Sequence, residues 1–195
     1  MSSSNLETRN RILAASLELL EASQGKGVRM SDIAKRAGVS RQALYLHFKT
    51  RADLLIGTTY YLDDIKGTAD RLAPSRSAQS GIRRLDAFIE AWGGYIPEIY
   101  GIAKALIAMS DTDDAAAAAW GQRMQDMREG CAAAIAALHA DKMLSPDYSP
   151  EQATDILWVL LSVHNWEQLT TVCGWSQSDY IALLKLTARK ICVTG

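Results

Sequence analysis

The sequence contains little cysteine and proline, and it has no hydrophobic run long enough to cross a bilayer. Its three cysteines, Cys131, Cys173 and Cys192, are far apart, which excludes a C-x-x-C zinc or redox pair. We expect them to be buried thiols in a reducing compartment. The longest apolar run, 156–161, is far shorter than the roughly 20 residues of a membrane-spanning helix. The first residues also lack the basic-then-apolar order of a signal peptide, so we expect a soluble, cytoplasmic protein with no membrane partner.

The chain also has almost no net charge. Its 21 Lys and Arg residues and 22 Asp and Glu residues give −1, and 48% hydrophobic with 22% charged residues is typical of a globular protein. As a total, this charge gives no reason to expect a nucleic-acid partner. Residues 1–51, however, carry nine basic and four acidic side chains, or +5, whereas the remainder carries 12 and 18, or −6. A basic first quarter on an acidic body is typical of a DNA-binding head attached to a domain that does not bind DNA.

Helical periodicity runs through most of the chain. With only four prolines and few β-branched clusters, the spacing of apolar residues predicts an all-α fold. Residues that cap helix starts stand before four of the helices: Ser40, Thr50, Ser149 and Ser176. We expect a linker at 73–80, around Pro74. The patterns predict about nine helices, at 8–23, 30–37, 41–48, 51–66, 81–92, 97–109, 111–138, 150–172 and 180–191.

The second and third predicted helices, 30–37 and 41–48, are short, and the turn that joins them contains Gly38. This is the helix-turn-helix arrangement, in which the second helix of the pair lies in the major groove of DNA. The apolar residues predicted to hold the pair together are Ile33, Ala34, Leu44 and Phe48. The residues then left to point outward are Arg41, Gln42, Ala43, Tyr45 and Leu46.

The outward residues have side chains that suit DNA. Arg and Gln match guanine and adenine edges, and Ala or Leu can touch a thymine methyl group. The donors suited to phosphate oxygens are Ser40, Tyr45, His47 and Lys49. The competing interpretation is a helical bundle in which Tyr45 is a core aromatic and the basic residues form a solvated face. The turn at Gly38 favours DNA contact over that interpretation.

At these positions the chain resembles a known family. The sequence SDIAKRAGVS at 31–40, followed by ALYLHFKT at 43–50, resembles the DNA-binding signature of the tetracycline-repressor (TetR) family. The segment RADLL at 51–55 resembles the start of the fourth helix of that family. The resemblance implies an N-terminal three-helix DNA-binding domain at 1–50 and a helical ligand-binding and dimerisation domain at 51–195.

The resemblance also implies roles for single residues. It places Arg41, Gln42 and Ala43 against base edges, and it places on phosphates Ser40, Tyr45, His47, Lys49 and Thr50. One departure is visible, because the family usually has Thr or Ser at the cap of the second helix, where this chain has Arg29 and Met30. We expect Arg29 to reach a phosphate instead.

Large aromatic side chains concentrate in the second domain. Of the two Phe, five Trp and seven Tyr, only Tyr45 and Phe48 precede residue 51. Such a helical body either packs solidly or encloses an apolar cavity of the kind that binds small molecules. Because the ligand site of the family lies among its fourth to eighth helices, the resemblance implies a partial lining of Tyr60, Phe88, Trp92, Tyr95, Tyr100, Met109, Trp120, Met124 and Trp158.

The last segments, 150–172 and 176–191, are apolar over more than one face and predict the contact of a homodimer. The sequence thus predicts a transcriptional regulator, most simply a repressor, that binds near-palindromic double-stranded operator DNA as a dimer. We expect a small apolar or aromatic effector to release it. The alternative is a DNA-binding regulator without a small ligand, controlled by a protein partner. An enzyme is disfavoured, since no metal-ligand or nucleophile–base pattern is present, and we expect no cofactor and no metal.

Overall fold

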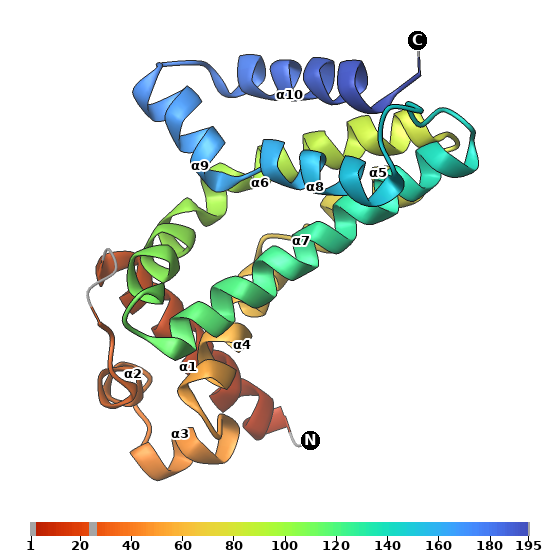
Figure 1. Ribbon diagram of the computed structural model, residues 1–195. Coiled ribbons are helices and arrows are strands. Elements are labelled where there is room, and N and C mark those ends of the chain that lie inside the picture. The colour runs from red at the N-terminus through yellow and green to blue at the C-terminus, as the bar shows by residue number, and fades with distance from the viewer. Residues whose placement is uncertain (1–2, 24–26, 195) are drawn as a thin grey trace. The chain divides into compact units, whose positions relative to one another are not determined.

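The structure is a computed structural model that describes residues 3–23 and 27–194. These residues form helices and no strand, apart from one isolated bridge between Leu144 and Val193, so the all-α prediction is confirmed. No helix in the described ranges is long and apolar enough to cross a membrane. The helices are α1 (Ser3–Ser23), α2 (Met30–Arg36), α3 (Arg41–His47), α4 (Arg51–Ile65), α5 (Thr68–Arg76), α6 (Gly81–Ser110), α7 (Asp114–Ala140), α8 (Pro150–Leu160), α9 (Val163–Trp166), the π-helical η1 (Glu167–Val172) and α10 (Gln177–Cys192) (Figure 1).

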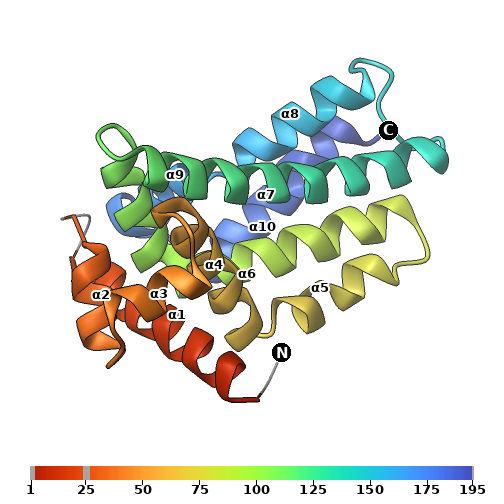
Figure 2. The same ribbon diagram turned by 90° about the horizontal axis from the view of Figure 1, so that it is seen from below.

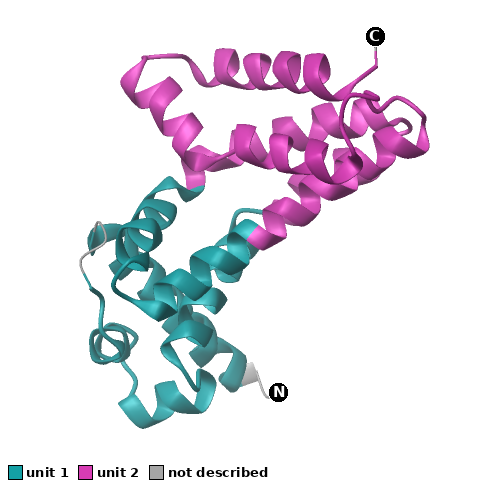
Figure 3. Cartoon of the chain, in the orientation of Figure 1, with its two compact units in different colours: residues 1–67, 99–124 teal, residues 68–98, 125–195 magenta. Residues whose placement is uncertain are grey.

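The chain divides into two compact units (Figure 3). Unit 1 comprises residues 1–67 and 99–124, and unit 2 comprises residues 68–98 and 125–195. Helices α6 and α7 therefore each contribute one part to each unit. Each unit is a set of residues that pack closely together. The limits of the units differ from the expected boundary at residue 50 between the DNA-binding domain and the second domain.

Unit 1 is built on the packing of α1 against α4. The buried apolar residues of these two helices include Ile12, Leu13, Leu20, Leu54 and Leu55. Within this apolar layer the buried Thr58 hydroxyl donates to Ser16 Oγ or to the Leu54 carbonyl, each at 2.8 Å. Because both hydroxyls find partners inside the layer, α1 and α4 bury polar groups without leaving them unsatisfied.

Unit 2 places α8 and α10 side by side (Figures 1 and 2). Its core includes Leu85, Ile89, Leu157, Tyr180 and Leu184, all buried. The start of α6 and the end of α7 approach closely, because a Cβ at Gly81 would lie 2.6 Å from the backbone of Leu138. A side chain larger than glycine is therefore excluded at residue 81 unless the two helices move apart.

Two predictions based on proline were wrong. The expected linker at 73–80 is helical in its first half, because α5 extends to Arg76 with Pro74 inside it, and α6 runs without a break through Pro97. A proline inside a helix removes one hydrogen bond and leaves the carbonyl four residues earlier without its partner. In α6 that carbonyl belongs to Gly93, and Gln177 Nε2 donates to it at 2.7 Å. A contact from α10 thus replaces the lost bond, while buried Ile96 and Ile99 hold both sides of the proline in the core.

The helix expected at 150–172 begins as predicted but ends early. Ser149 caps it through a reciprocal pair of hydrogen bonds with Gln152, at 2.9 and 3.2 Å. Helix α8 then stops at Leu160, and Ser162 caps α9. The reason is tertiary, because the Leu161 carbonyl accepts a hydrogen bond from Trp92 Nε1 at 2.8 Å.

The cysteine prediction was correct for two residues and wrong for the third. Cys131 and Cys192 are buried, and burial raises their pKa values to about 12 and about 11, which makes them poor nucleophiles at neutral pH. Cys173 is exposed instead, directly after η1.

Candidate nucleic-acid interface

The turn between α2 and α3 has the geometry that the sequence predicts. Gly38 adopts φ = +66°, a left-handed conformation that glycine adopts without strain. The Gly38 N–H donates to the Lys35 carbonyl at 3.2 Å, and the Val39 N–H donates to the Ala34 carbonyl at 3.0 Å. These two bonds form a Schellman motif, which satisfies the last carbonyls of α2 and redirects the chain.

Helix α3 is fixed at both ends. The Ser40 hydroxyl accepts a hydrogen bond from the Ala43 N–H at 3.0 Å at its start. Leu44 and Phe48 are buried, and the guanidinium carbon of Arg9 lies 5.1 Å from the centroid of the Phe48 ring. Gly57 lets α4 come close, because a Cβ there would lie 3.1 Å from Phe48. One face of α3 is therefore anchored in unit 1, and its orientation is set.

The opposite face of α3 carries the predicted base-contacting residues. Arg41 and Gln42 are exposed, and Ala43 is half-buried. Tyr45 is 43% exposed, and Leu46 is 81% exposed beside it. Leu46 points outward as predicted, and its exposure makes it a candidate for the expected apolar contact with a thymine methyl group.

The expected phosphate contacts lie at the ends of the helices. Ser40 and Lys49 are exposed and His47 is half-buried. Thr50 forms a capping box with Asp53, with both hydrogen bonds at 3.0 Å, so its hydroxyl already accepts one backbone N–H. Arg29 is exposed at the N-cap of α2, where its side chain makes no capping bond and its backbone N–H donates to Asp32 Oδ2 at 3.2 Å.

Arg51, the first residue of α4, points into unit 1 rather than outward. Its Nε donates to Asp113 Oδ2 at 3.0 Å, and another of its nitrogens, Nη1, donates to the Val28 carbonyl. Burial opposes ionisation of Asp113, but the hydrogen bond and charge of Arg51, with two backbone N–H donors, outweigh burial and hold the pKa of this carboxyl below its ordinary 3.8. No local pattern indicates this pair, because its members are 62 residues apart in the chain.

The residues predicted to line a ligand pocket fall in both units. Unit 1 contains five of them, Tyr60, Tyr100, Met109, Trp120 and Met124, and unit 2 contains four, Phe88, Trp92, Tyr95 and Trp158. In unit 2 the rings of Trp92 and Tyr95 meet edge to face, with centroids 6.3 Å apart and an interplanar angle of 68°. Both residues are buried.

Three of these predicted residues are tyrosines with a cation over the ring. The guanidinium of Arg123 lies over Tyr60 at 5.7 Å, that of Arg71 lies over Tyr95 at 5.3 Å, and the Lys104 ammonium lies over Tyr100 at 5.6 Å. A cation at this distance is attracted by the negative face of the ring. These tyrosines therefore already have cationic neighbours, which the sequence pattern did not indicate.

Comparisons with known proteins agree with the geometry of the helix-turn-helix that α2 and α3 form. Residues 12–57 match the family described as "Bacterial regulatory proteins, tetR family". The chain is 26% identical over 159 residues to the HTH-type transcriptional regulator CymR of Pseudomonas putida, a match that covers 80% of this chain and 75% of CymR. Residues 12–57 therefore form a TetR-family DNA-binding domain. With this domain the chain is a DNA-binding transcriptional regulator.

Solved structures show that the likeness in fold extends over almost the whole of this regulator. A protein from Rhodococcus sp. that is assigned to the TetR family matches with a TM-score of 0.74 at 23% identity, over 95% of this chain and 98% of that one. A protein from Saccharomonospora viridis, solved in complex with choline, matches with a TM-score of 0.72 at 19% identity, over 97% and 99% of the two chains. At these identities the matches establish the fold of the regulator.

Proposed function

We propose that this regulator is a dimeric transcriptional repressor that binds near-palindromic double-stranded operator DNA through its head. A small apolar or aromatic effector then releases it. In this proposal residues 1–50 bind DNA, and residues 51–195 bind the effector and form the dimer. A dimer bound across an operator presents two recognition helices to two half-sites about one helical turn apart.

The observation that carries the proposal is the division of α3 into a buried face and an exposed face. Leu44 and Phe48 hold the helix in unit 1, while Arg41 and Gln42 remain free of the core. Arg and Gln are the side chains that form paired hydrogen bonds with guanine and adenine in the major groove. Ser40 and Lys49 flank them with groups suited to phosphate.

The dimer is supported by exposed apolar residues in unit 2. Four large hydrophobic residues between residues 150 and 192 are exposed: Val159 of α8, Val172 of η1, Trp175 shortly before α10, and Leu186 of α10. Trp175 and Leu186 also line an open groove of about 580 Å³, together with Ala182, Leu183 and neighbouring polar residues. Exposed apolar side chains that line one groove, as Trp175 and Leu186 do, mark protein interaction sites in soluble proteins. A second copy of the segments 150–172 and 176–191 would cover them.

The effector is supported by the aromatic content of the second domain and by the choline complex of the protein from Saccharomonospora viridis. Release requires that the effector bind the arrangement that cannot hold DNA more tightly than the one that can. For a shift from mostly bound to mostly released, this difference in affinity is of the order of 10⁴-fold.

The test begins with selection of duplexes from a random double-stranded library by the full-length protein, with the double variant Arg41→Ala/Gln42→Ala as control. We expect the wild type to enrich a near-palindromic motif and the control to lose it. No enrichment by the wild type would contradict operator binding.

A thermal-shift screen of small molecules on the same protein follows, in which a compound that raises Tm must also lower affinity for the selected duplex. A protein that binds the duplex and responds to no compound would favour control by a protein partner.

A further inference from the structure

We propose that Arg51 is a positioning residue for DNA binding, which fixes the start of α2 to the start of α7. The proposal rests on DNA binding by the head and does not require an effector. It differs from the role that a basic residue beside Lys49 suggests, namely a direct phosphate contact.

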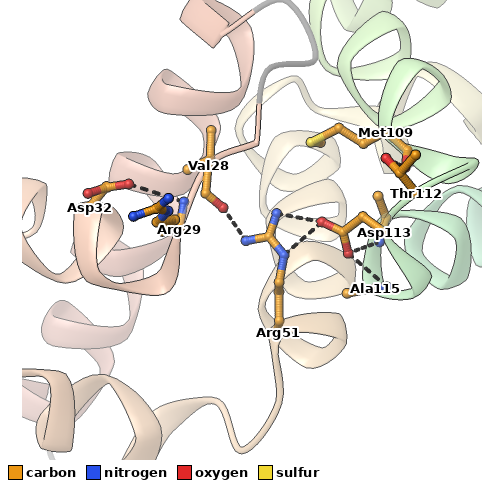
Figure 4. Close-up of polar contacts among 9 residues, drawn as sticks. Val28, Arg29, Asp32, Arg51, Met109, Thr112, Asp113 and Ala115 are labelled. Carbon is orange, nitrogen blue, oxygen red and sulfur yellow. Dashed lines mark hydrogen bonds and ion pairs between the residues drawn. The ribbon is translucent and has the colours of Figure 1, made fainter.

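The guanidinium of Arg51 bridges two segments that are distant in sequence (Figure 4). Toward α7, Nε and Nη2 both bond Asp113 Oδ2, at 3.0 and 2.9 Å. Toward α2, Nη1 bonds the carbonyl of Val28, which directly precedes the N-cap residue of α2. Because the side chain of Arg51 is 22% exposed and that of Asp113 is 25% exposed, the ion pair is only partly screened by solvent.

Each end of this bridge continues into the first turn of a helix. Asp113 Oδ1 accepts the N–H groups of Ala115 and Ala116 at 3.0 and 3.3 Å, so the same carboxylate caps α7. Its own N–H donates to the Met109 carbonyl at 2.9 Å, which closes the turn after α6. A continuous set of hydrogen bonds therefore runs from the start of α7 through Arg51 to Val28.

On the α2 side, the backbone continues from Val28 into the cap of the helix. The Arg29 N–H donates to Asp32, and the Asp32 and Ile33 N–H groups donate to the Arg29 carbonyl at 3.0 and 3.2 Å. Helix α2 is joined to α3 by the short turn at Gly38. The position at which Arg51 holds Val28 thus helps to set the position of the recognition helix.

Arginine is required for this role because its planar group binds two acceptors in different directions. Lysine retains the charge but is a point donor without the fork. The pair Arg123–Asp63 provides a matched control. This pair also joins α7 to α4 in unit 1, with bonds of 2.7 and 3.1 Å. The side chains of Arg123 and Asp63 are less exposed, at 13% and 17%, and neither residue lies within the DNA-binding residues 1–50.

The experiment compares Arg51→Lys, Asp113→Asn and Arg123→Gln with the wild type, by fluorescence anisotropy on the selected duplex at one salt concentration. We expect Arg51→Lys and Asp113→Asn each to weaken binding about tenfold or more and Arg123→Gln to change it less than about twofold. A phosphate contact by Arg51 predicts the opposite for Asp113→Asn, because a freed Arg51 would bind DNA more tightly. Unchanged or tighter binding by Asp113→Asn would overturn the proposal.

Hydrogen exchange on the same proteins without DNA tests the link independently of function. Asp113→Asn should speed exchange of the Arg29, Asp32 and Ile33 amides several-fold, whereas Arg123→Gln should leave them unchanged. Equal exchange at these amides in both variants would contradict the link.

Since coupling between sites is reciprocal, added duplex should also slow the Ala115 and Ala116 amides in the wild type but not in Arg51→Lys. A wild type that binds no duplex would reject the proposed function, while the DNA-free comparison would still decide whether Arg51 positions α2.

Discussion

Helix α3 and the segment formed by α8, η1 and α10 both expose large apolar side chains, but their neighbours differ. On α3 the exposed Leu46 lies among Arg41, Gln42 and Tyr45. Between residues 150 and 192 four large apolar residues are exposed, among them Val172 and Leu186. Exposed apolar area is therefore not specific for one kind of partner. Hydrogen-bond donors around it favour a base edge and phosphates, whereas further apolar side chains favour a protein surface.

Charge separates the two regions in the same way. The first 51 residues carry +5 and the remainder carries −6. The attraction of the head to phosphate is electrostatic and depends on salt. The apolar contact expected in unit 2 depends on removal of surface from water and depends much less on salt. Variants that affect one region and not the other can separate the two contributions.

The largest effect is expected from charges in the proposed dimer surface. The double variant Val172→Glu/Leu186→Glu should convert dimers to monomers, because two carboxylates would be buried without partners. Affinity for a two-half-site operator should fall about 100-fold or more, since the second half-site no longer adds to binding. Sedimentation velocity and anisotropy measure the two effects. Ile65→Glu, a similar change at an exposed residue of α4, is the control and should remain dimeric. A dimer that survives the double change would refute this surface.

A smaller effect, confined to one operator position, is expected from Gln42→Ala. Loss of a paired contact with a base costs about 1–3 kcal/mol of discrimination. Binding measured on duplexes altered one base pair at a time should show relaxed preference at a single position in each half-site. Full specificity in the variant would remove Gln42 from the base contacts.

Lys49→Ala should weaken binding to all sequences by a similar factor. The expected cause is loss of one phosphate contact, which lowers the slope of log affinity against log salt by about one. Titrations at several salt concentrations measure the slope. Lys190→Ala, at an exposed basic residue near the end of α10, serves as control and should leave the slope unchanged.

The smallest effect is the contribution of Asp113 to stability in acid. Because its folded pKa is lowered from 3.8, its stabilising effect is complete above that value and is lost as pH falls through the folded pKa. Urea unfolding across the acid range should show a steeper loss of stability in the wild type than in Asp113→Asn. In Arg51→Gln the cation that lowers the pKa of this carboxyl is gone while burial, which raises it, remains, so the loss of stability in acid should be smaller than in the wild type. An identical pH profile in all three proteins would exclude the pair as a source of stability.

The features that could be predicted from the sequence depend on residues close together in the chain. Ser149 bonds to a residue three positions later, and the turn at Gly38 is closed by bonds that span three and five residues. The wrong predictions about proline involved Pro74 and Pro97, because a proline inside a helix costs about 3 kcal/mol and the local sequence therefore favours a break. For Pro97 the offset comes from Gln177, a partner that no local pattern indicates.

The sequence by itself determined the head: the capped helices, the left-handed turn and the outward Arg41 and Gln42 all follow from local hydrogen bonds and helical spacing. Only the tertiary structure decided that Arg51 points inward to Asp113, that helix α8 ends at Leu160, and that Cys173 is exposed. These outcomes depend on burial and on partners far away in the chain. Such partners become neighbours only when the helices pack.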